Sequence, residues 1–149
     1  MKILHPTDFS GCAAQAEATA VDLARQLDGE LVLFQVLVET PLYAEGLLNM
    51  PTVQRVYDAQ RKWSEETLEA RAGDLRQRGI KASWRLEAGV PFEEIVKVAD
   101  DERADMIVMG THGRSGLNRV LLGSVAERVI RLAPCPVLTV RQAKPGGSG

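Results

Sequence analysis

The sequence predicts an α/β protein built on one open, five-stranded parallel sheet with helices on both faces. Three observations support this fold class. Five short apolar segments alternate along the chain with four segments of helical periodicity. One of the apolar segments, 31–38, is almost continuously apolar, which is typical of a strand covered on both faces. The 149 residues suit a single domain, which we place at 1–142, followed by a flexible tail at 143–149.

Each expected strand is a short apolar segment with a clear end. The first stops at Pro6, whose nitrogen cannot donate to a sheet ladder. The third alternates, with Ala82, Trp84 and Leu86 on one face. The expected strands are 2–5, 30–38, 81–87, 106–109 and 136–140.

The helices between these strands begin and end at recognisable residues. Ser10 is a suitable N-cap for the first helix, and Gly29 follows its end. Pro91 fits the first position of the third helix, where Glu93 and Glu94 complement the helix dipole. The last helix opens at 124 and stops before the proline at 134.

The second expected helix, 51–78, is long and mostly polar. Gln60 and Ser64 interrupt its apolar stripe, so we expect the middle of this helix to be less deeply buried. The stripe consists of Val53, Val56, Tyr57, Leu68, Ala72 and Leu75.

A glycine-rich segment joins the fourth strand to the last helix. It reads G-x-x-G, nine further residues, then G-S, and runs from Gly110 to Ser124. Glycines let the backbone approach a ligand closely, and N–H groups at a helix start bind phosphate. Arg114 and a second arginine, Arg119, make the segment locally positive. The segment therefore predicts a phosphate-binding loop, and the alternative is a surface loop with solvated arginines.

The first strand ends at the place where such sheets bind ligands. Ligands lie beyond the carboxyl ends of parallel strands, where the winding direction reverses. The carboxylate of Asp8 leaves the first strand there and can accept hydrogen bonds from ribose hydroxyl groups. The alternative for Asp8 is a helix cap or turn residue. Neither G-x-x-x-x-G-K-[ST] nor G-x-G-x-x-G occurs, which argues against a P-loop ATPase and a nicotinamide dehydrogenase.

Composition excludes several other classes. A net charge of −2 and 5% aromatic residues argue against a general nucleic-acid binder. No apolar run approaches the roughly 18 residues that span a bilayer, and the start of the chain has no signal-peptide core, so we expect a cytoplasmic protein. Cys12 and Cys135 are isolated and are expected to be small core residues.

Three segments together resemble the universal stress protein family. Residues 4–10, Leu-His-Pro-Thr-Asp-Phe-Ser, resemble its opening motif, and 133–138 resemble its closing strand. Residues 109–113 with 123–125 resemble its ATP-binding signature, G-x-x-G-x9-G-[ST]. The resemblance covers essentially the whole chain. It implies a Rossmann-like sheet of strand order 3-2-1-4-5, ATP at the carboxyl edge with Mg²⁺ held mainly by its phosphates, and a dimer through the last strand.

The resemblance also implies the binding residues by motif position. Asp8 would contact the ribose, Gly110 would lie close to it, and Val36 would offer backbone groups to the adenine. Pro6, Thr7 and Met109 would help to wall the base and sugar. Gly113, Gly123, Ser124 and Val125 would hold the phosphates. Apart from the resemblance, His112 and Arg114 could contact phosphate or face solvent. The expected set is Pro6, Thr7, Asp8, Val36, Met109, Gly110, His112, Gly113, Arg114, Gly123, Ser124 and Val125.

The apolar part of the last strand, 137–140, would leave an unprotected edge at the end of the sheet. Antiparallel pairing with a second copy would protect that edge, so we expect a homodimer through Val137 to Val140. Coverage by the loop or tail of the same chain is the alternative.

The favoured function is an ATP-binding stress-response or signalling module. Two alternatives stay open: a dimeric interaction scaffold without nucleotide dependence, and a nucleotide-using enzyme. The second lacks support, since neither H-x-G-H nor S-G-G-x-D-S occurs. No catalytic set is legible, so at most slow ATP hydrolysis is expected. Residues 39–50 follow the second strand at the same sheet edge, and a lid over the nucleotide is a hypothesis for them.

Overall fold

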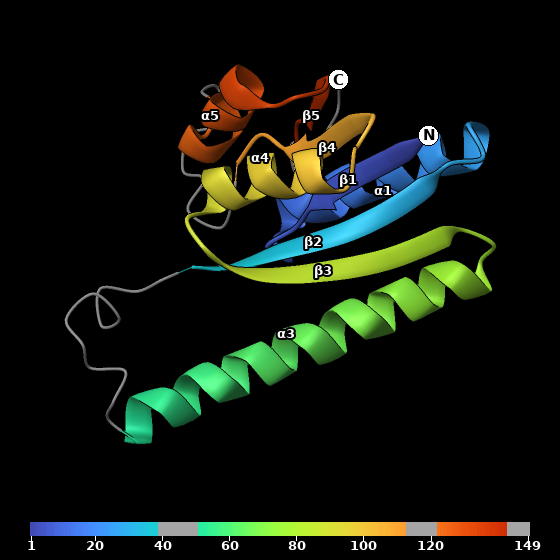
Figure 1. The fold of residues 1–149 in the computed structure, drawn as a ribbon. Coiled ribbons are helices and arrows are strands. Elements are labelled where there is room, and N and C mark those ends of the chain that lie inside the picture. Colours follow the sequence, from blue (N-terminus) through green and yellow to red (C-terminus); the bar gives the residue numbers. More distant parts are fainter. Residues whose placement is uncertain (39–50, 113–121, 143–149) are drawn as a thin grey trace, which may run out of the picture.

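The computed structural model of the chain describes residues 1–38, 51–112 and 122–142. Its five strands are all parallel and form one sheet in the order β3-β2-β1-β4-β5 (Figure 1). Both the predicted fold class and the implied strand order are confirmed. Residues 39–50, for which a lid is the hypothesis, and the expected tail at 143–149 lie outside the described residues. The strands are β1 (Lys2–Pro6), β2 (Glu30–Val38), β3 (Lys81–Gly89), β4 (Met106–Gly110) and β5 (Val137–Val140).

The helices follow the signals read from the sequence. Ser10 caps the first helix, where its side chain accepts the Ala13 N–H at 3.2 Å. Pro91 occupies the first turn of the third described helix, with Glu93 and Glu94 beside it. The helices are α1 (Gly11–Gln26), α3 (Pro51–Gln77), α4 (Pro91–Asp101) and α5 (Ser124–Leu132).

Each face of the sheet has its own apolar core. Helices α1 and α3 cover one face, and α4 and α5 cover the other (Figure 1). Successive strand residues face opposite ways, so Ile3 belongs to the first core and Leu4 to the second. This double cover explains why β2 reads as an almost unbroken apolar run.

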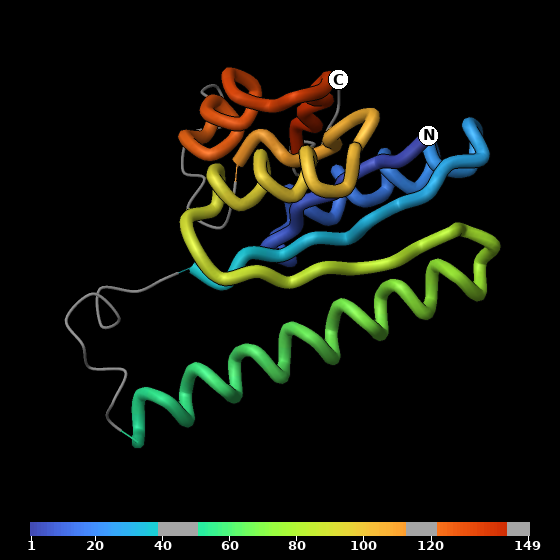
Figure 2. The backbone as a smooth tube through the Cα atoms, viewed as in Figure 1, coloured from blue at the N-terminus to red at the C-terminus, as the bar shows by residue number. Residues whose placement is uncertain are grey.

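Helix α3 is longer than the strands that it covers. Its 27 residues span about 40 Å, whereas the nine residues of β3 span about 30 Å. The first turns of α3 therefore extend past the ends of the strands (Figures 1 and 2). The expectation that its middle is less buried is wrong at Ser64, which is 2% exposed, whereas Val56 in the overhanging part is 59% exposed.

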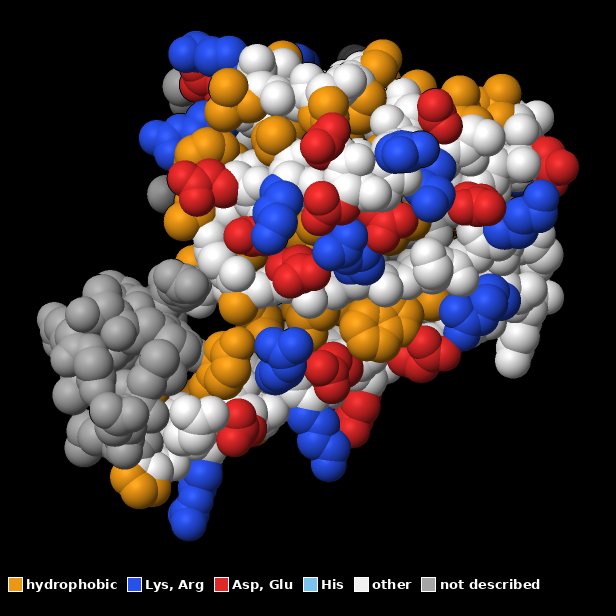
Figure 3. All heavy atoms as spheres, viewed as in Figure 1, with side chains coloured by type: hydrophobic (Ala, Val, Ile, Leu, Met, Phe, Trp, Pro, Cys, Tyr) orange, Lys and Arg blue, Asp and Glu red, His pale blue; other side chains and the backbone are white. Residues whose placement is uncertain are grey.

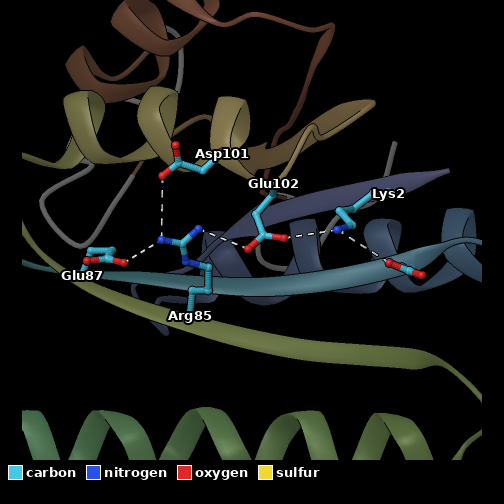
Figure 4. A network of polar contacts seen from close by, with 6 residues as sticks. Lys2, Arg85, Glu87, Asp101 and Glu102 are labelled. Carbon is cyan, nitrogen blue, oxygen red and sulfur yellow. Dashed lines mark hydrogen bonds and ion pairs between the residues drawn. The ribbon is translucent and has the colours of Figure 1, made fainter.

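A network of ion pairs connects β1, β3 and α4 on the other face of the sheet. Arg85 lies between Glu87, Asp101 and Glu102, and Glu102 also pairs with Lys2 at 3.2 Å (Figure 4). Burial opposes the charge on Glu102, but hydrogen bonds from Lys2 and Arg85 outweigh it and lower the pKa of this carboxyl. Figure 3 shows basic and acidic side chains mixed over this surface, with apolar side chains along the line where α3 meets the sheet.

Candidate functional site

Strands β1 and β4 are neighbours in the sheet, but their pairing stops before either strand ends. The register between β1 and β4 stops at the pair Leu4–Ile107. Alternate residues of a parallel strand face the same neighbour, so the next donor from β1 toward β4 would be residue 6. Pro6 has no N–H to give. The N–H of Thr7, in contrast, donates to the Phe34 carbonyl of β2 at 2.7 Å. β1 thus remains paired with β2 to its end, whereas its pairing with β4 stops at the point where the winding direction of the sheet reverses.

His5 supplies the donor that Pro6 lacks. Its ring is completely buried, and Nδ1 lies 2.8 Å from the carbonyl oxygen of Val108 in β4. Because a carbonyl only accepts, Nδ1 carries the proton and Nε2 of the neutral ring is an acceptor. Among the described residues, neither Nε2 nor the side-chain oxygen of Gln35 has a hydrogen-bond partner. The imidazole therefore ties β1 to β4 across the missing ladder bond.

The burial of His5 makes stability depend on pH. Burial lowers the pKa of His5 from its ordinary 6.5, and the charge of Arg71 adds to this; the bond to Val108 and the charges of Glu17 and Asp8 oppose it. The unfolded chain therefore binds this proton more readily. We expect the free energy of unfolding to fall as the pH drops below about 6.5, with a slope of at most about 1.4 kcal/mol per pH unit for one proton.

Urea unfolding at about pH 7.5 and pH 5.5 checks this expectation. The matched variant is His5→Gln, which keeps a side-chain N–H donor but does not titrate. The wild type should lose stability between the two pH values by more than the variant does. An equal loss in both proteins would show that His5 does not carry the effect.

A tight turn follows β1 and holds the Asp8 carboxylate in place. Oδ1 of Asp8 accepts the Ser10 N–H at 2.9 Å, and the Thr7 hydroxyl accepts the Phe9 N–H at 3.0 Å. Between these bonds Phe9 has a φ of 60°, a left-handed conformation that costs a non-glycine residue roughly 1–2 kcal/mol. Asp8 thus has the turn role that was the alternative to ribose binding. The two roles are compatible, because one carboxylate accepts several hydrogen bonds at once.

Val36 lies on β2 just beyond the end of β1. Pro6 is in register with Phe34, which places Val36 two residues further along β2. Since the Phe34 carbonyl faces β1, the backbone groups of Val36 face the same side, beyond the last residue of β1. Its half-buried side chain packs against the core on the α4 and α5 face. Only the backbone of Val36 therefore faces the switch point.

Thr111 joins the two ends of the glycine-rich segment. Its N–H donates to the Val140 carbonyl at 3.2 Å, and its own carbonyl accepts the Gly123 N–H at 2.8 Å. Its hydroxyl lies 3.1 Å from Nδ1 of His112. The start of α5 is thereby held beside the end of β4. Sequence reasoning missed Thr111, because nothing in its local pattern marks a residue that bonds on three sides.

Two glycines at this edge, Gly110 and Gly123, lie where any larger side chain would clash with neighbouring protein atoms. A Cβ at Gly110 would lie 2.7 Å from the sulfur of Cys12, and a Cβ at Gly123 would lie 2.8 Å from the Thr111 carbonyl oxygen. Cys12 is 4% exposed, as expected for a core residue. Both glycines are therefore needed for the close approach of protein segments, whatever ligand binds.

The structure brings most of the expected binding residues to one edge of the sheet. Pro6, Thr7 and Asp8 end β1, Met109 to His112 end β4, and Gly123 with exposed Ser124 begins α5. Met109 is 6% exposed and belongs to the core, as half-buried Val125 does at its margin. The expected phosphate contacts Gly113 and Arg114 lie outside the described residues.

Residues 1–38, 51–112 and 122–142 contain no group of three His, Cys, Asp or Glu side chains that could hold a metal ion. None of the helices in these ranges has the length and apolar character needed to cross a membrane.

Strand β5 is the last strand at its end of the sheet and pairs with β4 on one side. Exposed apolar side chains accompany it: Leu138 on the strand is 39% exposed, and Ile130 and Leu132 of α5 are 45% and 54% exposed. Within residues 1–38, 51–112 and 122–142, no strand pairs with the other side of β5.

Comparisons with known proteins agree with this geometry. A model of the universal stress protein family matches residues 1–141. Universal stress protein MJ0531 of Methanocaldococcus jannaschii is 38% identical over 143 residues, which cover 96% of this chain and 83% of that protein. Universal stress protein UspA from Lactobacillus plantarum superposes with a TM-score of 0.81 at 26% identity, over 95% of this chain and 97% of the other.

A further solved structure contains a nucleotide. It is the universal stress protein from Archaeoglobus fulgidus in complex with dAMP, which is 25% identical to this chain and superposes with a TM-score of 0.69. The match covers 95% of this chain and 98% of the other.

Proposed function

Because the chain belongs to the universal stress protein family, we propose that it is a cytoplasmic stress-response or signalling module that binds ATP at the carboxyl edge of its sheet. The observation that carries this proposal is the parting of β1 and β4 beside Pro6. Asp8, the backbone of Val36 and the start of α5 lie around this place at the carboxyl edge of the sheet. The dAMP complex of the Archaeoglobus relative supports an adenine nucleotide as the ligand.

The groups around this place match the parts of a nucleotide. The carboxylate of Asp8 is held by the turn after β1 and would accept ribose hydroxyl groups. Backbone groups of Val36 would bind the adenine edge. Gly123 and the exposed Ser124 open α5, where N–H groups and the positive end of the helix dipole would hold phosphates. Mg²⁺ would accompany ATP and be held mainly by phosphate oxygens.

A thermal-shift titration tests the proposal. Nucleotide-free protein is titrated with Mg-ATP, and with Mg-GTP for comparison. A hundredfold excess over Kd contributes about 2.7 kcal/mol, or about 5 to 10 °C in Tm for a chain of this size. We expect the shift with ATP to exceed that with GTP, because the proposed base contacts are specific for adenine.

Two variants locate the ligand. Asp8→Asn and Ser124→Ala are expected to reduce the shift with ATP. Ser83→Ala is the matched control, since Ser83 is exposed on β3 and lies away from the carboxyl edge. Substitution of Gly123 is avoided, because its Cβ would meet the Thr111 carbonyl. No shift in the wild type would contradict ATP binding and favour an interaction scaffold that does not depend on nucleotide.

We also propose that β5 pairs with β5 of a second copy to form a homodimer. The exposed Leu138 would be buried at that interface, so Leu138→Lys should weaken the dimer by at least about tenfold through the burial of an unpaired charge. Analytical ultracentrifugation at micromolar concentration measures this. Val56→Lys adds the same charge at an exposed position on α3 and should leave the dimer intact. A monomeric wild type would contradict the proposal.

A further inference from the structure

The turn after β1, which contains Asp8, contacts a side chain of helix α3, a helix far away in the sequence. The ring of Phe9 packs edge-on against the ring of Trp63 in α3, with centroids 5.6 Å apart and planes at 84°. Trp63 is 52% exposed, so it contributes little to the main core. Eight residues further along both segments, Arg71 of α3 pairs with Glu17 of α1. Helix α3 thus contacts the β1–α1 segment at Phe9 as well as at Glu17.

The conformation of Phe9 sets where the Ser10 N–H lies relative to the Asp8 carboxylate. The bond from the Ser10 N–H to Asp8 Oδ1 spans the φ and ψ angles of Phe9. At a φ of 60° the two groups meet at 2.9 Å. A different φ at Phe9 would move the Ser10 N–H relative to this carboxylate, so the present arrangement of the bond depends on the Phe9 conformation. A bulky residue keeps a left-handed conformation only where its surroundings hold it there.

We propose that Trp63 is a positioning residue of the nucleotide site: it holds the Phe9 ring, fixes the left-handed turn, and so sets how strongly Asp8 selects a nucleotide with intact ribose hydroxyl groups. This inference rests on the proposed function. It names a specificity determinant that does not itself touch the ligand. Selection among sugars therefore depends on where α3 lies, as well as on the residues at the sheet edge.

The first test compares ATP with 2′,3′-dideoxy-ATP by calorimetric titration of nucleotide-free protein. The measured quantity is the ratio of the two Kd values, which isolates the hydroxyl contacts. A hydrogen bond to a charged group corresponds to roughly tenfold or more in affinity, so the ratio should be at least about ten in the wild type. Trp63→Leu should bring the ratio close to one by weakening ATP binding, while Kd for the dideoxy nucleotide changes little.

Three further variants separate positioning from general damage. Trp63→Phe keeps an aromatic ring at this position and should retain most of the ratio. Phe9→Gly adopts a positive φ without support, so adding Trp63→Leu to it should change the ratio little. Val56→Ala trims another exposed apolar residue of the same helix and should leave the ratio unchanged.

Hydrogen exchange of the Ser10 amide gives a readout that needs no nucleotide. Its bond to Asp8 should protect it in the wild type and in Val56→Ala, and Trp63→Leu should speed its exchange by about tenfold or more. Unchanged exchange and an unchanged ratio in Trp63→Leu would overturn the inference, as would equal weakening of both nucleotides. A wild type that binds neither nucleotide would overturn the proposed function instead, and the amide exchange would still decide whether Trp63 holds the turn.

Discussion

Arg71→Met is expected to lower the free energy of unfolding by about 3 kcal/mol. Arg71 of α3 pairs with Glu17 of α1, which is 7% exposed and has little access to water. Removing the guanidinium leaves a carboxylate buried without its partner. The expected loss stays at the lower end for such pairs, because the Arg71 side chain itself is 48% exposed. Urea unfolding monitored by circular dichroism measures it.

The matching variants identify the cause of that loss. Arg55→Met removes the same charge from an exposed position of α3 and should cost less than about 0.5 kcal/mol. The double variant Glu17→Met, Arg71→Met should recover most of the stability, since an apolar pair of similar volume needs no counter-charge. A double variant as unstable as Arg71→Met would mean that lost packing, rather than the unpaired carboxylate, causes the effect.

Gly110→Ala is expected to destabilise the protein by about 3 kcal/mol, at the upper end of the usual range for overpacking. The new methyl group would lie 2.7 Å from the Cys12 sulfur and 3.2 Å from the Cys12 carbonyl oxygen. The sulfur cannot move away easily, because it is buried beside Thr111 and the Val140 carbonyl. The effect concerns folding and should appear in the absence of any nucleotide.

A second substitution tests the proposed clash directly. Cys12→Ala removes the sulfur and should restore part of the stability of Gly110→Ala, so the two changes together cost less than their sum. Gly73→Ala is the control within helix α3, where a Cβ would meet only Arg76 Nη2 at 3.8 Å. It should stabilise the protein slightly, by up to about 1 kcal/mol. Additive costs at 12 and 110 would show that the sulfur is not the obstacle.

The sheet could be predicted from the sequence because a parallel strand that is covered on both faces is apolar at nearly every position. Such a composition is visible without any knowledge of the fold. The run in β2 and the short apolar segments of β1 and β4 have no other stable place than a doubly covered sheet. The caps at Ser10 and Pro91 marked helix starts for local reasons that need no tertiary contact. The strand order came from family resemblance, since periodicity does not state which strands are neighbours.

Burial along α3 could not be predicted, because it depends on how far the sheet reaches. The helical pattern gives Val56 and Leu68 the same apolar stripe, but only Leu68 lies over the sheet. Ser64 is buried for the same reason in spite of its hydroxyl. A periodic pattern reports which face of a helix is apolar, and the length of the neighbouring strands decides how much of that face is covered.

The candidate site divides in a similar way. Asp8 could be placed at the switch point because its position follows from the end of a strand. The left-handed conformation of Phe9 could not, since its ring packs against the core and against Trp63, more than fifty residues away in the chain. The hydrogen bond from His5 to Val108 joins residues 103 apart in the chain, and no local sequence pattern in either segment predicts it. Local signals located the site, and long-range contacts shape it.

The bond between His5 and Val108 has a consequence for how related sequences should vary. The imidazole is needed because Pro6 gives Val108 no backbone donor. A relative with another residue than proline at position 6 regains that donor, and its residue 5 is then free to be an ordinary apolar core residue. We therefore expect positions 5 and 6 to change together across diverging relatives, so that proline is accompanied by a side chain that can donate a hydrogen bond.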